Sequence, residues 1–82
     1  MHEVGVASGI IEAVRKEMEP RTGARATKVG VRIGEMAGID PESLAFCFEA
    51  LIKGTDMEPL ALEILRGGAD ELEFAFLELE EP

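Results

Sequence analysis

The sequence predicts an α+β domain in which two amphipathic helices cover one face of a three-stranded sheet, in the order helix, strand, helix, strand, strand. In two segments, apolar residues recur every three or four positions, as on one face of a helix. In three other segments, apolar residues alternate with other residues, as in a strand. Glycine or proline separates the segments. A chain of 82 residues is long enough for one hydrophobic core and too short for two. We therefore expect residues 1–82 to form a single domain.

The first helix is expected over residues 6–18, where one face carries the apolar side chains of Ala7, Ile10, Ile11, Val14 and Met18. Pro20 and Gly23 end it. The next segment, residues 28–34, alternates, and its apolar face carries Val29, Val31 and Ile33. Because the intervening residues are charged or glycine, this segment is expected to be a strand with one solvated face.

The second helix has the clearest pattern in the chain. Asp40 is expected to be its N-cap, with Pro41 at the first helical position and Glu42 in the first turn. Its buried stripe is expected at Leu44, Cys47, Phe48, Leu51 and Ile52. Gly54 is expected to end the helix in the left-handed conformation. Since a free cysteine in such a stripe behaves as a small hydrophobe, Cys47 is interpreted as a core residue.

Two further strands complete the predicted sheet. Pro59 precedes an alternation at Leu60, Leu62 and Ile64, and Gly67-Gly68 breaks the strand. In the last segment the apolar side chains change parity, from Leu72, Phe74 and Phe76 to Leu77 and Leu79. Because a strand has a period of two, the switch at Phe76-Leu77 predicts a β-bulge or a twist between two packing partners.

Charge and composition exclude several classes of function. The 17 acidic and 8 basic residues give a net charge of -9, which disfavours nucleic acid and anionic membranes as partners. With one histidine and one cysteine, the chain has no phosphate-binding GxxxxGK[ST], no GxGxxG after a strand and no HExxH, so enzyme motifs are unsupported. The single cysteine and the uncharged, glycine-diluted N-terminal stretch are expected of a cytoplasmic protein.

The unusual feature is His2, which follows Met1 directly. The amine of Met1, the amide nitrogen of His2 and its imidazole would form adjoining five- and six-membered chelate rings. Nitrogen donors in a square-planar array suit Ni(II) or Cu(II). Because the amine must lose its proton to bind, metal affinity should rise with pH. Taken alone, the same residues also fit a solvated chain terminus.

Several segments together resemble one family. Met1-His2-Glu3 leads directly into a helix and is followed by VRIGE at 31–35, GIDPESL at 38–44, FCFE at 46–49 and Gly54-Thr55. This combination resembles the HypA family, the nickel metallochaperones of [NiFe]-hydrogenase maturation, some of which also serve urease. The resemblance runs from Met1 to about Ile64, and ELEFAFLELE at 71–80 is similar to the closing strand of the family.

The resemblance implies that nickel is bound by the amine of Met1, by the backbone nitrogen and imidazole of His2, and by the backbone nitrogen of Glu3. Asp40 would approach as a weaker oxygen ligand. Structural roles also fit these two acidic residues, because Glu3 favours the start of a helix through the macrodipole and Asp40 caps the second helix. For the side chain of Glu3 both roles stay open, whereas for Asp40 capping is favoured. The implied partners are a maturation GTPase and the hydrogenase large subunit, and no enzyme activity is implied.

The sequence departs from the family in two places. The family usually has Ser at position 5, where Gly5 would be a weaker N-cap. Family members also carry a zinc domain with two CxxC pairs between the second and third strands, where this chain has only Gly67-Gly68. We therefore expect a single nickel-binding domain over residues 1–82 and no zinc in this chain. Natural loss and engineered excision both fit, and the two-glycine junction favours excision and a short hairpin with positive φ angles.

Two other interpretations compete with nickel delivery. One is an acidic, metal-free domain that docks on a basic partner surface. The other is a small acid–base enzyme using Glu35 and Asp40, for which the sequence offers no partner base. A three-stranded sheet also has two edges, and apolar side chains of the first helix and of the strand at 72–79 favour a homodimer, against which the net charge acts.

Overall fold

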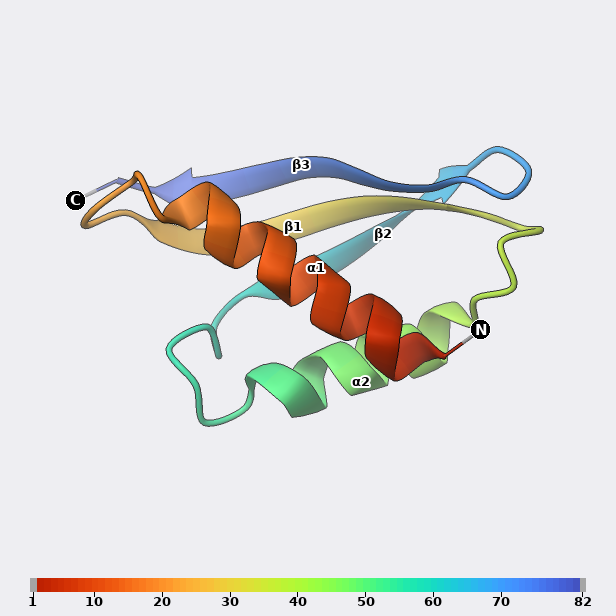
Figure 1. The fold of residues 1–82 in the computed structure, drawn as a ribbon, viewed down its shortest axis with the longest axis horizontal. Helices are drawn as coiled ribbons and strands as arrows, with labels where there is room; N and C mark the ends of the chain where they lie inside the picture. Colours follow the sequence, from red (N-terminus) through yellow and green to blue (C-terminus); the bar gives the residue numbers. More distant parts are fainter. Residues whose placement is uncertain (1, 82) are drawn as a thin grey trace.

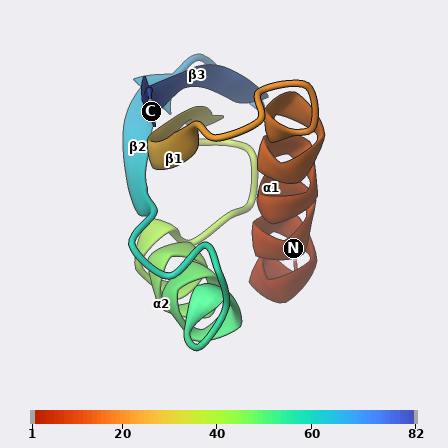
Figure 2. The same cartoon turned by 90° about the vertical axis from the view of Figure 1, so that its left-hand side faces the viewer.

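The computed structural model describes residues 2–81 and contains two helices and one sheet. Their order is α1 (Glu3–Met18), β1 (Arg25–Gly34), α2 (Pro41–Ile52), β2 (Ala61–Gly67) and β3 (Leu72–Glu80). Both helices lie on the same side of the sheet, as Figures 1 and 2 show. The predicted α+β class, element order and arrangement of two helices on one sheet face are confirmed. Neither helix has the length and apolarity that crossing a bilayer requires within residues 2–81.

The central strand of the sheet is β1, and the strand order is β2-β1-β3. Strand β1 pairs with β2 in parallel and with β3 in antiparallel orientation. The parallel pairing needs a crossover connection, which α2 provides. At the middle of β1, Val29 lies between Leu62 of β2 and Leu77 of β3. This position explains why the apolar face of β1 is almost completely buried.

The core lies between the sheet and the two helices. Its buried side chains come from all layers: Ala7, Ile10, Ile11, Val14, Val29, Val31, Ile33, Ile39, Leu44, Phe48, Ile52 and Leu60. Cys47 packs against this core, as predicted. The prediction for Leu51 is wrong, because its side chain is 42% exposed. The buried stripe of α2 is narrower than expected and follows the i, i+4, i+8 spacing of Leu44, Phe48 and Ile52.

The predicted start of α1 is also wrong. The helix begins at Glu3, and its N-cap is His2, whose φ of -88° and ψ of 100° are extended. Gly5 therefore lies inside the first turn and caps nothing. In α2 the predicted boundaries hold, and Gly54 has a φ of +79° just beyond the helix end. The sequence places α2 correctly because its D-P-E start and glycine stop are local signals.

The predicted bulge is present in β3, slightly before the expected position. Gly30 pairs with Phe76, but the next residue of β1, Val31, pairs with Phe74, so that Ala75 is an extra residue. The bulge brings Phe74 and Leu77 to the helix side although their positions differ in parity. The ring of Phe76 instead lies across Gly30, where a β-carbon would meet it.

The hairpin predicted at Gly67-Gly68 is wrong, because β2 and β3 lie on opposite sides of β1. The connection at residues 68–71 crosses the end of β1, where the N–H of Gly34 donates to the carbonyl of Glu71 and the N–H of Met36 donates to that of Ala69, both at 2.9 Å. The positive φ of this connection is at Ala69, at 46°, and not at the glycines.

Candidate metal site

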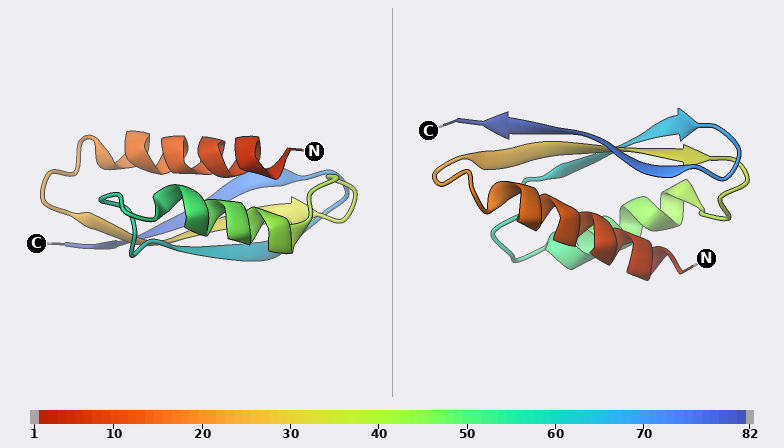
Figure 3. Two further views of the ribbon diagram at one scale, coloured as in Figure 1. Left: turned by 90° about the horizontal axis from the view of Figure 1, so that it is seen from below. Right: turned by 45° about the horizontal axis from the view of Figure 1, so that its top comes forward.

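The amino ends of the two helices meet at one end of the molecule. Figures 1 and 3 show the start of α1 beside the start of α2 and the loop that precedes it. A hydrogen bond joins them: the backbone N–H of Asp40 donates to Oε2 of Glu3 at 3.0 Å. The structure therefore brings together two of the residues predicted for the metal site, although 37 positions separate them. Of the others, His2 is adjacent in sequence and Met1 lies outside the described residues.

The backbone nitrogen of Glu3 has no carbonyl partner within α1. The first hydrogen bond of the helix runs from the N–H of Val6 to the carbonyl of His2, at 3.2 Å. The amides that precede Val6 have no carbonyl partner in the helical ladder, as at every helix amino end. A metal ion could therefore take the Glu3 nitrogen without breaking a helical hydrogen bond.

The side chain of His2 is exposed and makes no capping hydrogen bond to α1. In a helix capped by Ser, Thr, Asp or Asn the side chain satisfies one of the amide donors. Here the imidazole does not, so its nitrogens are not committed to the helix. Imidazole, a backbone nitrogen of the same residue and the next backbone nitrogen thus form one contiguous set of possible donors.

The carboxylate of Glu3 lies between two sources of partial positive charge. The Asp40 N–H, followed by the N–H of Glu3 itself, holds the pKa of this carboxyl below its ordinary value of 4.5. Both N–H groups belong to helix amino ends, where the macrodipole favours negative charge. The side chain is therefore ionised and directed at α2 rather than into solvent.

Asp40 caps α2, as predicted. Its Oδ1 accepts a hydrogen bond from the N–H of Glu42 at 3.2 Å, and its Oδ2 accepts one from the hydroxyl of Ser43 at 2.9 Å. Both carboxylate oxygens are thus engaged by the helix that Asp40 begins. Glu35 is exposed in the preceding loop, and within residues 2–81 no hydrogen bond links it to Asp40.

Sequence reasoning missed the contact between Glu3 and Asp40. Each residue stands at a recognisable helix start, but no local pattern says that the two starts meet. Among residues 2–81 there is no group of three or more His, Cys, Asp or Glu side chains able to hold a metal ion. The donors predicted for this site are mainly nitrogens of the main chain, which form no such side-chain cluster.

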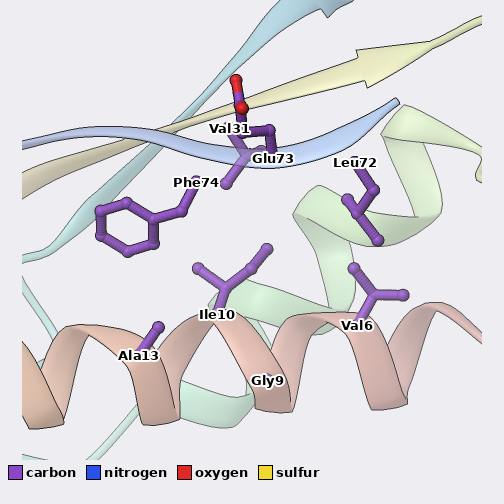
Figure 4. A pocket seen from close by; sticks show the side chains of 8 residues that line it. All are labelled: Val6, Gly9, Ile10, Ala13, Val31, Leu72, Glu73 and Phe74. Atoms are coloured by element: carbon purple, nitrogen blue, oxygen red, sulfur yellow. The ribbon is translucent and has the colours of Figure 1, made fainter.

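A second feature is an apolar groove between α1 and β3, with a volume of about 240 Å³. Figure 4 shows Val6, Ile10 and Ala13 of α1 facing Leu72 and Phe74 of β3. Both β3 side chains remain partly open to solvent, Leu72 at 46% and Phe74 at 38% exposure. The residues that line the groove are apolar except for Glu73.

Comparison with known proteins identifies close relatives. Residues 1–70 match the family model described as "Hydrogenase/urease nickel incorporation, metallochaperone, hypA". A hydrogenase maturation factor HypA from Archaeoglobus fulgidus is 43% identical over 70 residues, which cover 85% of this chain and 64% of that protein. One from Chlorobium limicola is 42% identical over 64 residues, covering 78% of this chain and 55% of that protein. The chain thus spans little more than half the length of several curated relatives.

The fold is also similar to a solved structure. The solution structure of the Ni metallochaperone HypA from Helicobacter pylori superimposes with a TM-score of 0.71 at 19% sequence identity. The match covers 93% of this chain and 72% of that protein. At this identity the similarity concerns the fold, and it agrees with the two-helix, three-stranded arrangement described above.

Proposed function

The chain belongs to the HypA family of hydrogenase/urease nickel-incorporation metallochaperones, and we propose that it binds Ni(II) at its N-terminus and carries it to [NiFe]-hydrogenase maturation. The proposed donors are the amine of Met1, the backbone nitrogen and imidazole of His2, and the backbone nitrogen of Glu3, with Asp40 as a weaker oxygen ligand. Nickel is the cargo of a carrier, and no covalent bond of a substrate changes.

The observation that carries this proposal is the start of α1 at Glu3, directly after the N-cap His2. Because Glu3 is the first helical residue, its backbone nitrogen is outside the helical hydrogen-bond ladder. An amine, two successive amide nitrogens and an imidazole form fused chelate rings that suit square-planar Ni(II). The contact between Glu3 and Asp40 supports the proposal, because it holds Asp40 at the same end of the molecule as His2 and Glu3.

The wider role is proposed from the family. The partners would be a maturation GTPase and the hydrogenase large subunit in the cytoplasm, with urease as a second target, since the family description includes both enzymes. We further propose that residues 1–82 act as one nickel-binding domain without zinc, in which Gly67-Gly68 replaces the zinc module. The connection at 68–71 supports this, because it joins β2 to β3 directly and its carbonyls accept backbone hydrogen bonds from Gly34 and Met36.

The direct test is nickel titration of protein whose N-terminus is confirmed as Met1 by intact mass. His2→Ala, and separately one residue added before Met1, should abolish stoichiometric binding and leave circular dichroism unchanged, because the buried side chains of α1 begin at Ala7. Binding to the unmodified protein should strengthen from mildly acidic to alkaline pH, since the donors must lose protons.

Glu12→Ala is the matched control, because Glu12 is exposed on α1 well away from the helix start. It should bind nickel as the unmodified protein does. Unchanged stoichiometry in both altered N-termini would contradict the site. An unmodified protein that binds no nickel would favour the metal-free interaction domain instead.

A further inference from the structure

The N-cap of α2 is completed by a residue of α1. In a capping box, the side chain three residues after the N-cap accepts a hydrogen bond from the N-cap backbone N–H, and that residue is usually Glu or Gln. In α2 this position is Ser43, whose hydroxyl instead donates to Oδ2 of Asp40. The acceptor for the Asp40 N–H is Oε2 of Glu3, at 3.0 Å. Glu3 of α1 thus accepts the hydrogen bond that a glutamate of α2 itself would accept in a capping box.

We propose that Glu3 is a positioning residue: its carboxylate clamps the first turn of α1 to the N-cap of α2 and thereby holds the His2–Glu3 backbone in place for nickel, without ligating nickel itself. This inference rests on the proposed function, because it assigns the side chain of one residue of the same site. It leaves the backbone nitrogen of Glu3 as the nickel donor.

Chelate geometry separates the two roles of Glu3. If its carboxylate and its own backbone nitrogen bound the same ion, they would close a seven-membered ring, which is less favourable than the five- and six-membered rings formed by the nitrogen donors. The carboxylate would also have to leave the Asp40 N–H. That donor would then exchange a carboxylate acceptor for water, and the charge-assisted hydrogen bond between the two helix starts would be lost.

The first turn of α1 depends on this contact because little else holds it. The buried residues of α1 begin at Ala7. Val6 packs against the core, whereas His2 and Gly5 are exposed and Val4 is 58% exposed. Of residues 2–5, Glu3 is therefore the one that ties the donor-bearing segment to the rest of the fold, and its loss should leave the core intact.

The test compares Glu3→Ala with Glu3→Gln, because the glutamine amide oxygen can still accept from the Asp40 N–H. We expect Glu3→Ala to weaken nickel binding by about 10- to 100-fold, the usual effect of losing a group that orients ligands. Glu3→Gln should bind with nearly the affinity of the unmodified protein. The d–d absorption spectrum of the nickel complex should be the same in all three proteins, because the donor set does not change.

Glu42→Gln is the control for charge. Glu42 stands in the first turn of α2, so this variant removes one carboxylate at the same end without touching the clamp, and it should bind nickel normally. If Glu3→Gln loses as much affinity as Glu3→Ala and shifts the spectrum, the carboxylate is a ligand and the inference is wrong. Equal binding by Glu3→Ala and the unmodified protein would overturn it as well.

Hydrogen exchange in metal-free protein separates this inference from the proposed function. The amide of Asp40 should exchange slowly in the unmodified protein and in Glu3→Gln, and rapidly in Glu3→Ala. Slow exchange in Glu3→Ala would overturn the clamp whatever the nickel data show. If the unmodified protein binds no nickel, the proposed function fails, and the inferred role in nickel binding fails with it, while the exchange result still decides whether the clamp exists.

Discussion

Glu3 is a single side chain that acts on two helices, and its electrostatics make a prediction that does not involve nickel. The hydrogen bond from the Asp40 N–H, and then its own N–H, lowers the pKa of Glu3 below 4.5 in the folded protein. The unfolded chain therefore binds a proton at this residue more readily than the folded one. Stability from the ionised carboxylate is present above the unfolded pKa and is lost as pH falls through the folded pKa.

We accordingly expect Glu3→Gln to reduce the free energy of unfolding at neutral pH, by an amount that shrinks as the pH falls below about 4.5. Denaturant unfolding of both proteins across pH 2 to 7 measures this difference. Glu42→Gln serves as the comparison. A constant difference between Glu3→Gln and the unmodified protein at every pH would contradict the pKa argument.

At the residue scale, the sequence indicated candidate residues for the site but not how they meet. Asp40 could be assigned as a cap because its D-P-E pattern is local, and the structure confirms that role. The bond from Asp40 to Glu3 spans 37 positions and depends on how α1 packs against α2. Sequence periodicity describes each helix face separately and therefore could not predict it.

At the scale of elements, one substitution within α1 is expected to stabilise the protein. Gly5 lies in the helix, and a β-carbon built there meets nothing within 4 Å. Gly5→Ala should therefore raise the free energy of unfolding by about 0.5–1 kcal/mol, because alanine loses less backbone entropy in a helix. Denaturant unfolding measures the change. A destabilised Gly5→Ala would mean that the helix starts later than Glu3.

The same substitution in β1 is the matched control and should have the opposite sign. A β-carbon on Gly34 would meet the backbone carbonyl of Ala69, where the 68–71 connection crosses the end of β1. Backbone cannot move aside as a flexible side chain does. We expect Gly34→Ala to destabilise the protein by about 1–3 kcal/mol.

The elements themselves were predicted well, and their order in the sheet was not. Alternation and helical spacing located both helices and all three strands, and the parity switch after Phe76 correctly predicted a bulge. The hairpin failed because periodicity says nothing about which strands are neighbours. Only the parallel pairing of β1 with β2, through α2, places β2 and β3 on opposite edges and sends residues 68–71 across β1.

At the scale of the whole molecule, the core explains why folding should not depend on metal. It is closed by apolar side chains from α1, α2 and β1, such as Val14, Phe48 and Val31. The proposed nitrogen donors precede this core in the chain, and the side chain of Asp40 is not part of it. Treatment with a chelator should therefore leave the circular dichroism spectrum and the melting temperature unchanged. A transition to unfolded protein on chelation would reveal a structural metal site.

Charge is distributed unevenly, and this bears on the homodimer expected from the sequence. The net charge of -9 opposes self-association. On β3, however, Glu73 and Glu80 are paired with Arg32 and Arg25 of β1, at 2.7 and 2.8 Å. The edge formed by β3 is thus locally compensated, and the apolar groove opens beside it. Among the apolar side chains of the strand at 72–79 that favoured a homodimer, Leu77 already packs against the core.

The residues that a second copy would cover are instead Leu72 and Phe74, whose side chains are partly exposed beside the groove (Figure 4). Since only 38% of Phe74 is exposed, covering it contributes a fraction of the roughly 1.5–3 kcal/mol of full burial, so the dimer should be weak. Added salt should strengthen it by screening the net charge. Sedimentation at low and high salt should then show association that Phe74→Ser reduces and Phe46→Ser does not, because Phe46 is exposed on α2, away from the groove. A monomer in both salts, well above micromolar concentration, would exclude the dimer.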